Sequence, residues 1–410
     1  MLATKRTLLI FLVLLLAACY SVQPTVEVLP PAPASPTPVP TLAPTETQVP
    51  PTATSTPTAT PKPSPTLPYP PEGYGPDHFP EDINPLTGLR VSDPSLLDRR
   101  PLGIKVNIVP RSSTRPPWGL SFADIVYDFY HNDGYSRFHA IFYGEDAPLV
   151  GPIRSGRLPD DPLVRTYDSI FVYGGADAKI NYQFTSSEYS DRLITEGRRS
   201  LCPPTDAFPL CREDPNAYDF LLGGTQEIHA FVKQEGIDDK RQNLDGMFFQ
   251  LDPPADGETA DQITIRYSGD SYARWEYDPK TEGYLRFQDA VFDQGQGEEY
   301  SPLTDRVNDE QIAADNVVVL FAPHEYFQRP PAEIIEILLS GGAEAYAFRD
   351  GKAYDLQWVR PASGGSIYLT FPDGDLYPFK PGKTWFQIVG ESSVLTKPES
   401  GAWRFEFKIP

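Results

Sequence analysis

The stretch DIVYDFYHNDGYSRFHAIFY, residues 124–143, decides how the first half of this chain folds. Apolar and polar side chains alternate over residues 124–130 and again over 136–143, which is typical of β-strands. Between them stands His131-Asn132-Asp133-Gly134, and an Asp-Gly pair adopts the backbone angles that a tight hairpin requires. The sequence therefore predicts an antiparallel β-hairpin.

Further strands are predicted on both sides of this hairpin. In the first half they cover residues 102–109 (LGIKVNIV) and 169–175 (SIFVYGG), and a helix is expected within 219–236, after two glycines. In the second half the predicted strands are residues 263–267, 273–277, 283–287, 316–321, 367–370 and 385–389. The 22 Tyr and 23 Phe, against 2 Met, also favour sheet over a helix bundle.

These elements predict an α+β protein with two domains. The cluster DPPADG at residues 252–257 interrupts the periodic segments with proline and glycine and marks the internal boundary. We expect a mixed α/β domain over residues 77–252 and a smaller, mainly antiparallel β domain over residues 258–395. A folded part of roughly 340 residues is long enough to bury a core in each domain.

The first 19 residues have the pattern of a secretory signal. Lys5 and Arg6 precede an apolar run over residues 8–16, which is too short to span a bilayer as a stable helix. The following LAAC, residues 16–19, resembles the lipobox of bacterial lipoproteins, in which the cysteine is acylated. We therefore predict an exported protein, anchored through acylated Cys19 to the outer face of the cytoplasmic membrane. The alternative is an ordinary signal peptide with an incidental cysteine.

Residues 20–76 form a Pro/Thr-rich segment that is predicted to be a disordered linker. Seventeen prolines lie within residues 24–71, and only three side chains there are charged. Proline fixes φ and removes backbone donors, so this composition favours extended polyproline II over a packed core. A stalk is the preferred interpretation; a Pro-rich ligand for an SH3-like partner and a carrier of O-glycans are the alternatives.

Charge and histidine spacing exclude several classes of function. The net charge is -21, and residues from Glu72 onward carry -22 of it; a chain so acidic is not expected to bind nucleic acid. The five histidines show no metal-ligand spacing, and no Walker, Rossmann or G-x-S-x-G pattern occurs. We expect neither a metal site nor a cofactor, and the sequence does not decide whether the protein is an enzyme.

Two cysteines remain after Cys19. Cys202 and Cys211 stand nine positions apart in an exported chain, so a disulfide between them is expected. The alternative is two free thiols.

One basic segment stands out against the acidic background. GPIRSGR, residues 151–157, sets Arg154 and Arg157 three positions apart around Ser155, and Arg137 lies on the preceding predicted strand. Guanidinium groups bind phosphate or carboxylate bidentately, so the three arginines are candidates to hold one anion. The alternative is that they pair internally with carboxylates such as Asp124 or Asp128.

A set of short motifs in order resembles one family, the YerB-like bacterial lipoproteins defined by domain of unknown function 3048 and its C-terminal companion. The motifs are residues 84–88 (NPLTG), 115–116 (RP), 119–120 (GL), 123–127 (ADIVY), 137–138 (RF), 151–157, 167–168 (YD), 174–175 (GG), 316–317 (NV) and 381–385 (PGKTW). The resemblance implies the two-domain α+β fold and supplies no reaction.

Two departures from the family pattern concern the site. Where such proteins carry Pro-His-Asn-x-Tyr, this chain has DPNAY at residues 214–218, so Pro215 replaces the histidine and any role of that histidine is in doubt. Asp128 stands where the family has glutamate. A looser similarity, in the arginine strand, the Pro-Ile-Arg motif and the Gly-Gly pair, is to LytR-CpsA-Psr wall-polymer transferases, whose arginines hold a polyprenyl pyrophosphate.

The leading functional hypothesis is an anchored protein that binds an anionic cell-envelope ligand, such as a wall polymer or polyprenyl phosphate, through Arg137, Arg154 and Arg157. Ser155 belongs to the same segment, Asp124 is predicted to orient an arginine, and Asn216 and Tyr218 to line the site. Two alternatives remain: an enzyme acting on wall glycan or polyprenyl-linked phosphate, and a structural module for a protein partner.

Overall fold

The computed structural model describes residues 69–409, except 215, 217–219 and 362–363. Cys19, the signal peptide and nearly all of the Pro/Thr-rich segment lie outside the described residues. No helix within the described ranges is long and apolar enough to cross a bilayer.

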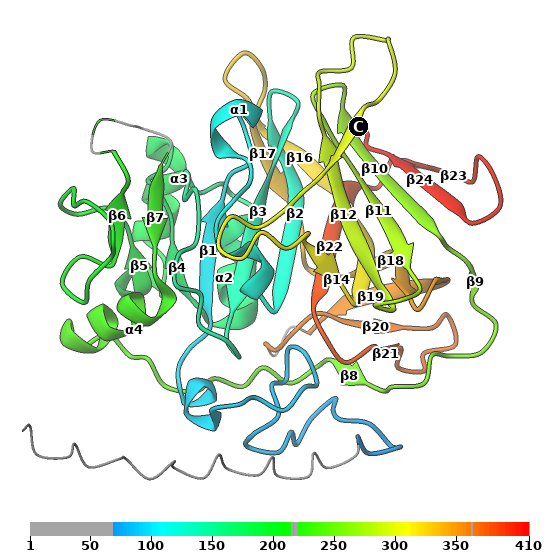
Figure 1. Ribbon diagram of the computed structural model, residues 1–410, viewed down its shortest axis with the longest axis horizontal. Helices are drawn as coiled ribbons and strands as arrows, with labels where there is room; N and C mark the ends of the chain where they lie inside the picture. Colours follow the sequence, from blue (N-terminus) through cyan, green and yellow to red (C-terminus); the bar gives the residue numbers. More distant parts are fainter. Residues whose placement is uncertain (1–68, 215, 217–219, 362–363, 410) are drawn as a thin grey trace, which may run out of the picture. The chain divides into compact units, whose positions relative to one another are not determined.

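An eleven-stranded sheet runs through both halves of the sequence (Figure 1). In spatial order it contains β20 (Tyr368–Thr370), β19 (Lys352–Arg360), β18 (Gly341–Arg349), β15 (Asn316–Ala322), β22 (Thr384–Gly390), β2 (Ile125–Asn132), β3 (Tyr135–Phe142), β1 (Leu102–Val106), β4 (Ile170–Val172) and β5 (Leu193–Ile194), with β9 (Glu258–Thr259) beside β19. The predicted hairpin is confirmed, since β2 and β3 pair antiparallel. Its turn uses Asp133 and Gly134, with φ of 53° and 86°.

The central strand of this sheet, β22, joins the two halves of the chain. It pairs in parallel with β15 on one side and with β2 on the other. The two segments predicted as separate domains therefore share one continuous sheet and do not form two independent sheets.

A seven-stranded sheet from the second half packs beside the first. It contains β13 (Tyr300–Pro302), β12 (Gly283–Asp289), β11 (Ser271–Asp278), β10 (Gln262–Ser268), β24 (Ala402–Glu406) and β23 (Val394–Thr396), with β14 (Ala313–Ala314) beside β12. Its pairs are antiparallel except β10 with β24. The β-rich second half is thus confirmed.

Small two-stranded sheets and short helices complete the structure. The strand pairs are β6 (Leu210–Arg212) with β7 (Leu221–Gly223), β8 (Phe248–Phe249) with β21 (Pro378–Phe379), and β16 (His324–Gln328) with β17 (Ile334–Ile337). The helices are α1 (Arg111–Thr114), α2 (Asp160–Tyr167), α3 (Ala178–Thr185) and α4 (Thr225–Gln234), with single 3₁₀ turns at Pro94–Asp98, Leu120–Phe122 and Ser190–Arg192. The predicted helix begins at Thr225, directly after Gly224.

Two buried ion pairs hold the halves together. Asp128 of β2 accepts a hydrogen bond from Arg286 of β12 at 2.8 Å, and both side chains are almost fully buried. Arg115, a residue of the family motifs, contacts Asp289 at the end of β12 at 3.1 Å. A buried pair is stable only when each charge keeps its partner, so these contacts fix the second sheet against the first.

Candidate functional site

Residues 151–157, which we call the arginine segment, lie across the carboxyl ends of two parallel strands. β1 and β4 pair in parallel, and the backbone N–H of Arg154 donates to the carbonyl of Lys105 in β1 at 3.0 Å. On the other side, the N–H of Gly174 donates to the Arg154 carbonyl, and that of Gly156 to the Gly175 carbonyl, each at 2.9 Å. Ligands of sheet proteins bind at such carboxyl ends.

The Gly-Gly pair after β4 is what lets the arginine segment approach so closely. A Cβ added at Gly174 would lie 3.3 Å from the Cα and carbonyl carbon of Arg154. Gly175 has φ of +95°, which side chains rarely adopt. A side chain at Gly174 would therefore press on the backbone of Arg154, and one at Gly175 would strain its own backbone.

Two arginine heads converge on one carbonyl oxygen. Arg137 Nη1 donates to the Ser155 carbonyl at 3.1 Å, and Arg157 Nη1 donates to the same oxygen at 3.4 Å and to the Gly156 carbonyl at 3.0 Å. Arg157 Nε also donates to His131 Nδ1 at 3.4 Å. In the described part of the chain, the Arg157 guanidinium makes no ion pair with a carboxylate.

A fully buried charged cluster supports the segment from below. Asp160, at the start of α2, accepts hydrogen bonds at Oδ1 from Lys105 Nζ, at 2.9 Å, and contacts His139 Nδ1 at 2.9 Å. Its Oδ2 accepts the backbone N–H of Arg157 at 2.6 Å. Lys105 Nζ also lies 3.8 Å from the centre of the Phe129 ring. One carboxylate thus neutralises the lysine and fixes the backbone at Arg157.

Burial and neighbouring charges shift the pKa values of Lys105, Asp160 and His131. Burial lowers the pKa of Lys105 to about 8, against the attraction of Asp160. Burial, followed by repulsion from Arg137 and Arg157, lowers the pKa of His131 well below its usual range, so His131 is neutral and accepts from Arg157. Burial alone would raise the pKa of Asp160, but Lys105 and His139 outweigh it and lower the pKa.

A cavity of about 350 Å³ opens beside Arg157 and Ser155. Three carboxylates also line it, those of Asp133, Asp177 and Glu333. Glu333 accepts hydrogen bonds from the Tyr130 hydroxyl and the Asp133 backbone, both at 2.8 Å, and Asp177 caps α3 through the Lys179 N–H. The cavity is therefore of mixed charge and not uniformly basic.

The other predicted site residues lie elsewhere. Asp124 directly precedes β2. Arg137 of β3 pairs with Phe129, which is five positions further along β2. Asp124 accepts hydrogen bonds from Asn84 Nδ2 and from the backbone N–H groups of residues 143 and 144, because it closes the turn after β3. None of these contacts, within the part of the chain that the structure describes, joins Asp124 to an arginine. Asp128, the alternative partner, is used by Arg286.

Most of the DPNAY loop, residues 214–218, lies outside the described residues, so the predicted role of Asn216 and Tyr218 stays a prediction. Asn216 is exposed, and its backbone N–H donates to Asp214 Oδ1 at 2.8 Å. Tyr218 and Pro215 lie outside the described residues. Among the described residues, no recorded contact joins Asn216 to the arginine segment.

Sequence reasoning missed Lys105, His131, His139 and Asp160. A signal for Lys105 was available, since it is the single charge inside the apolar strand LGIKVNIV, and all five residues of β1 are buried. A buried lysine requires a carboxylate partner. Nothing in the sequence identified Asp160 as that partner, because 55 residues separate them.

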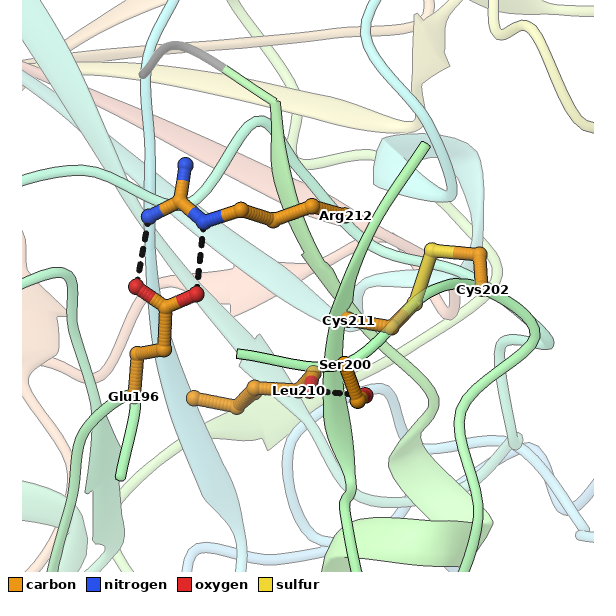
Figure 2. Close-up of a disulfide and its surroundings, with 6 residues drawn as sticks. All are labelled: Glu196, Ser200, Cys202, Leu210, Cys211 and Arg212. Carbon is orange, nitrogen blue, oxygen red and sulfur yellow. Dashed lines mark hydrogen bonds and ion pairs between the residues drawn. A yellow bond between two sulfur atoms is a disulfide. The ribbon is translucent and has the colours of Figure 1, made fainter. Parts of the chain in front are cut away.

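The predicted disulfide is confirmed (Figure 2). Cys202 and Cys211 are bonded, with their Cα atoms 4.9 Å apart. Next to the bridge, Arg212 of β6 makes a two-pronged ion pair with Glu196 at 2.5 and 2.6 Å. The bridge and the ion pair fix this loop to β6. Among the described residues, no group of three or more His, Cys, Asp and Glu could hold a metal ion.

Residues 86–239 match the N-terminal domain, and residues 263–386 the C-terminal domain, of the protein of unknown function DUF3048. The chain belongs to the YerB-like DUF3048 family. The domain boundaries predicted at 77–252 and 258–395 stay predictions.

A relative and a solved structure of the same protein agree with this family. The chain is 28% identical over 310 residues to "Putative lipoprotein YerB" of Bacillus subtilis (strain 168), an alignment that covers 74% of this chain and 85% of the relative. The crystal structure of YerB from Bacillus subtilis superimposes with a TM-score of 0.59 at 25% identity, covering 75% of this chain and 96% of that one. The fold of this DUF3048 protein is thus similar to that of YerB.

Proposed function

We propose that this protein is a lipid-anchored, extracytoplasmic binding protein that holds an anionic cell-envelope ligand at the Arg137, Arg154 and Arg157 segment. The observation that carries the proposal is the convergence of the Arg137 and Arg157 heads on the Ser155 carbonyl, beside an open cavity. Arg157 lines this cavity with its guanidinium bonded to neutral acceptors, and a guanidinium in that position can form a charge-assisted, two-pronged contact with an incoming anion.

The carboxylates of the cavity restrict which anion it can hold. Asp133, Asp177 and Glu333 repel a bare polyanion, so we expect a ligand whose charge is partly neutralised. A phosphate paired with a divalent cation, or a phosphate ester that also carries an amine, meets this requirement.

The anchor rests on two observations. LAAC at residues 16–19 has the lipobox pattern, and the YerB relative carries the name of a lipoprotein. An acylated Cys19 would place the domains outside the cytoplasmic membrane, where anionic wall polymers and polyprenyl phosphates are found.

Binding of inorganic pyrophosphate, with and without Mg²⁺, tests the proposal by isothermal titration calorimetry. Arg157→Ala removes a charge-assisted contact and is expected to weaken binding about tenfold or more. Ser155→Glu leaves all three arginines in place, adds a negative charge to the cavity, and is expected to weaken binding similarly. Arg90→Ala, at an arginine that pairs with Asp82 on the surface, is the matched control and should bind like the parent.

Two results would contradict the proposal: no saturable binding under either condition, or equal affinity in the Arg157 and Ser155 variants and the parent. Thermal unfolding of each variant separates loss of binding from loss of folding. Turnover of a polyprenyl-pyrophosphate glycan that disappears in Arg154→Ala would point to the enzyme alternative.

A further inference from the structure

Helix α3 presents one polar and aromatic stripe to solvent. Ile180 and Phe184 face inward, where Phe184 packs edge-on against Phe171 and Tyr173. The opposite stripe has the helical spacing i, i+3, i+4, i+7 and consists of Lys179, Tyr182, Gln183 and Ser186. Tyr182 is 74% exposed, so neither burial nor packing of α3 explains an aromatic residue there.

A second exposed aromatic side chain faces the same space. Phe327 of β16 is 52% exposed and lines, with Tyr182, a cavity of about 730 Å³. The β16–β17 hairpin is held beside α3, because Lys179 Nζ donates to Gln328 Oε1 and Ile334 packs in the same cluster as Phe184. Single exposed aromatics are ordinary, but two from distant segments around one cavity indicate a binding surface.

The rest of the cavity wall offers hydrogen bonds and one further cation, Lys179, whose Nζ donates to Gln328 Oε1. It contains Gln183, Ser186, Ser187 and Glu188. Arg165 closes one end, and its charge is compensated by Asp161, with two bonds of 3.1 and 3.2 Å, and by Glu188. Arg165 also borders a neighbouring cavity of about 660 Å³ beside Arg360 and Gly341, so the two cavities meet at this side chain.

We propose that this cavity is a binding site for an uncharged oligosaccharide. The flat, C–H-bearing faces of pyranose rings pack against aromatic rings, here those of Tyr182 and Phe327. Hydroxyl and acetamido groups at the ring edges both donate and accept, which matches the amide, hydroxyl and carboxylate groups of Gln183, Ser186, Ser187 and Glu188. The extension past Arg165 suits a chain of several sugars.

Other ligand classes fit this surface less well. An acyl chain would be enclosed by apolar side chains on all sides, whereas Gln183, Ser186 and Ser187 also line this cavity. An anionic membrane surface would require a cluster of several Lys and Arg, whereas this wall has two, and one of them, Arg165, is paired with Asp161 and Glu188. The saccharide proposal does not depend on ligand binding at the arginine segment. The two cavities are neighbours, since Asp177 and Ile180 of the α3 region line the cavity beside Arg157.

The test is calorimetric titration of the full chain with a soluble β-1,4-linked tetramer of N-acetylglucosamine. Tyr182→Ala and Phe327→Ala are each expected to weaken binding about tenfold, and Tyr182→Phe, which keeps the ring, to retain most of it. Phe292→Ala is the matched control, since Phe292 is also 52% exposed and does not line the cavity. Both rings are exposed, so these variants should fold like the parent.

The two proposals fail separately. Arg157→Ala is expected to bind the tetramer normally, and Tyr182→Ala to bind pyrophosphate normally. No saturable binding of the tetramer at millimolar concentration, or unchanged affinity in the Tyr182 and Phe327 double variant, would overturn the saccharide site. Binding of uncharged phosphatidylcholine vesicles that the double variant loses would show a lipid-binding surface and overturn it as well.

Discussion

Several charged and polar residues are buried in the interior of this protein. Lys105, Asp160 and His139 are completely buried, and Asp160 stabilises the other two there because it lies within hydrogen-bond distance of both. A sequence shows such residues individually as anomalies in apolar segments. Their partners follow only from the fold, because they come from β1, β3 and α2.

Buried histidines predict how stability responds to acid. Burial lowers the pKa of His324 to about 4, although the carbonyl of Ala322 opposes this shift. The unfolded chain takes up a proton at His324 near pH 6.5, and the folded protein does not. The contribution of neutral His324 to the free energy of unfolding is therefore complete above pH 6.5 and is lost as the pH falls toward 4.

His324→Phe should therefore flatten the pH dependence of the free energy of unfolding. The change between pH 7 and pH 5 is expected to shrink by about 2 kcal/mol, measured by urea unfolding at both pH values. His78→Gln is the comparison: the hydrogen bond to Asp77 raises the pKa of His78, so this substitution removes a contribution of opposite sign and should not flatten the pH dependence. An identical pH dependence in His324→Phe and the parent would show that His324 does not titrate on unfolding.

At the scale of elements, hairpins were predictable where the turn chemistry is explicit. Asp133-Gly134 marks the β2–β3 turn, and Asp350-Gly351, with φ of 53° and 69°, marks the turn of the β18–β19 hairpin that we did not predict. The eight-residue helices α2 and α3 were also missed. Helices of two turns contain too few periodic positions to stand out, and these depend on packing against the sheet for their stability.

The disulfide predicts a local and measurable effect on the loop before β6. Closing a loop of about ten residues stabilises a fold by about 2–3 kcal/mol in the chain-entropy model. The double variant Cys202→Ser and Cys211→Ser should lose that amount in urea unfolding. Its trypsin cleavage at Arg198 and Arg199 should accelerate, while cleavage at Arg241 serves as the internal reference. Equal stability and equal cleavage rates would mean that β6–β7 pairing holds the loop without the bridge.

At the scale of the whole molecule, the sheet decides how the two family segments relate. β22 inserts between β15 and β2, so residues 384–390 complete a sheet begun more than 250 residues earlier. Neither segment can bury its sheet edges alone, and we expect them to unfold as one unit.

Membrane attachment also belongs to this scale. Cys19→Ala should abolish acylation, release the protein into the aqueous phase on Triton X-114 partition, and leave the fold of residues 69–409 intact. Mass spectrometry of the mature N-terminus measures the modification directly. An unmodified Cys19 in the parent protein, together with aqueous partition, would rule out the anchor.

The sequence by itself determined the strand-rich α+β class, the central hairpin, the Cys202–Cys211 bridge and the family, because each depends on local spacing or on short motifs. Only the tertiary structure decided which charges meet. It separated Asp124 from the arginines, assigned Asp128 to Arg286, and placed Lys105 and Asp160 beneath Arg157. Lys105 and Asp160 lie 55 positions apart, and Asp128 and Arg286 lie 158 apart. No local pattern specifies contacts between residues so distant in the sequence.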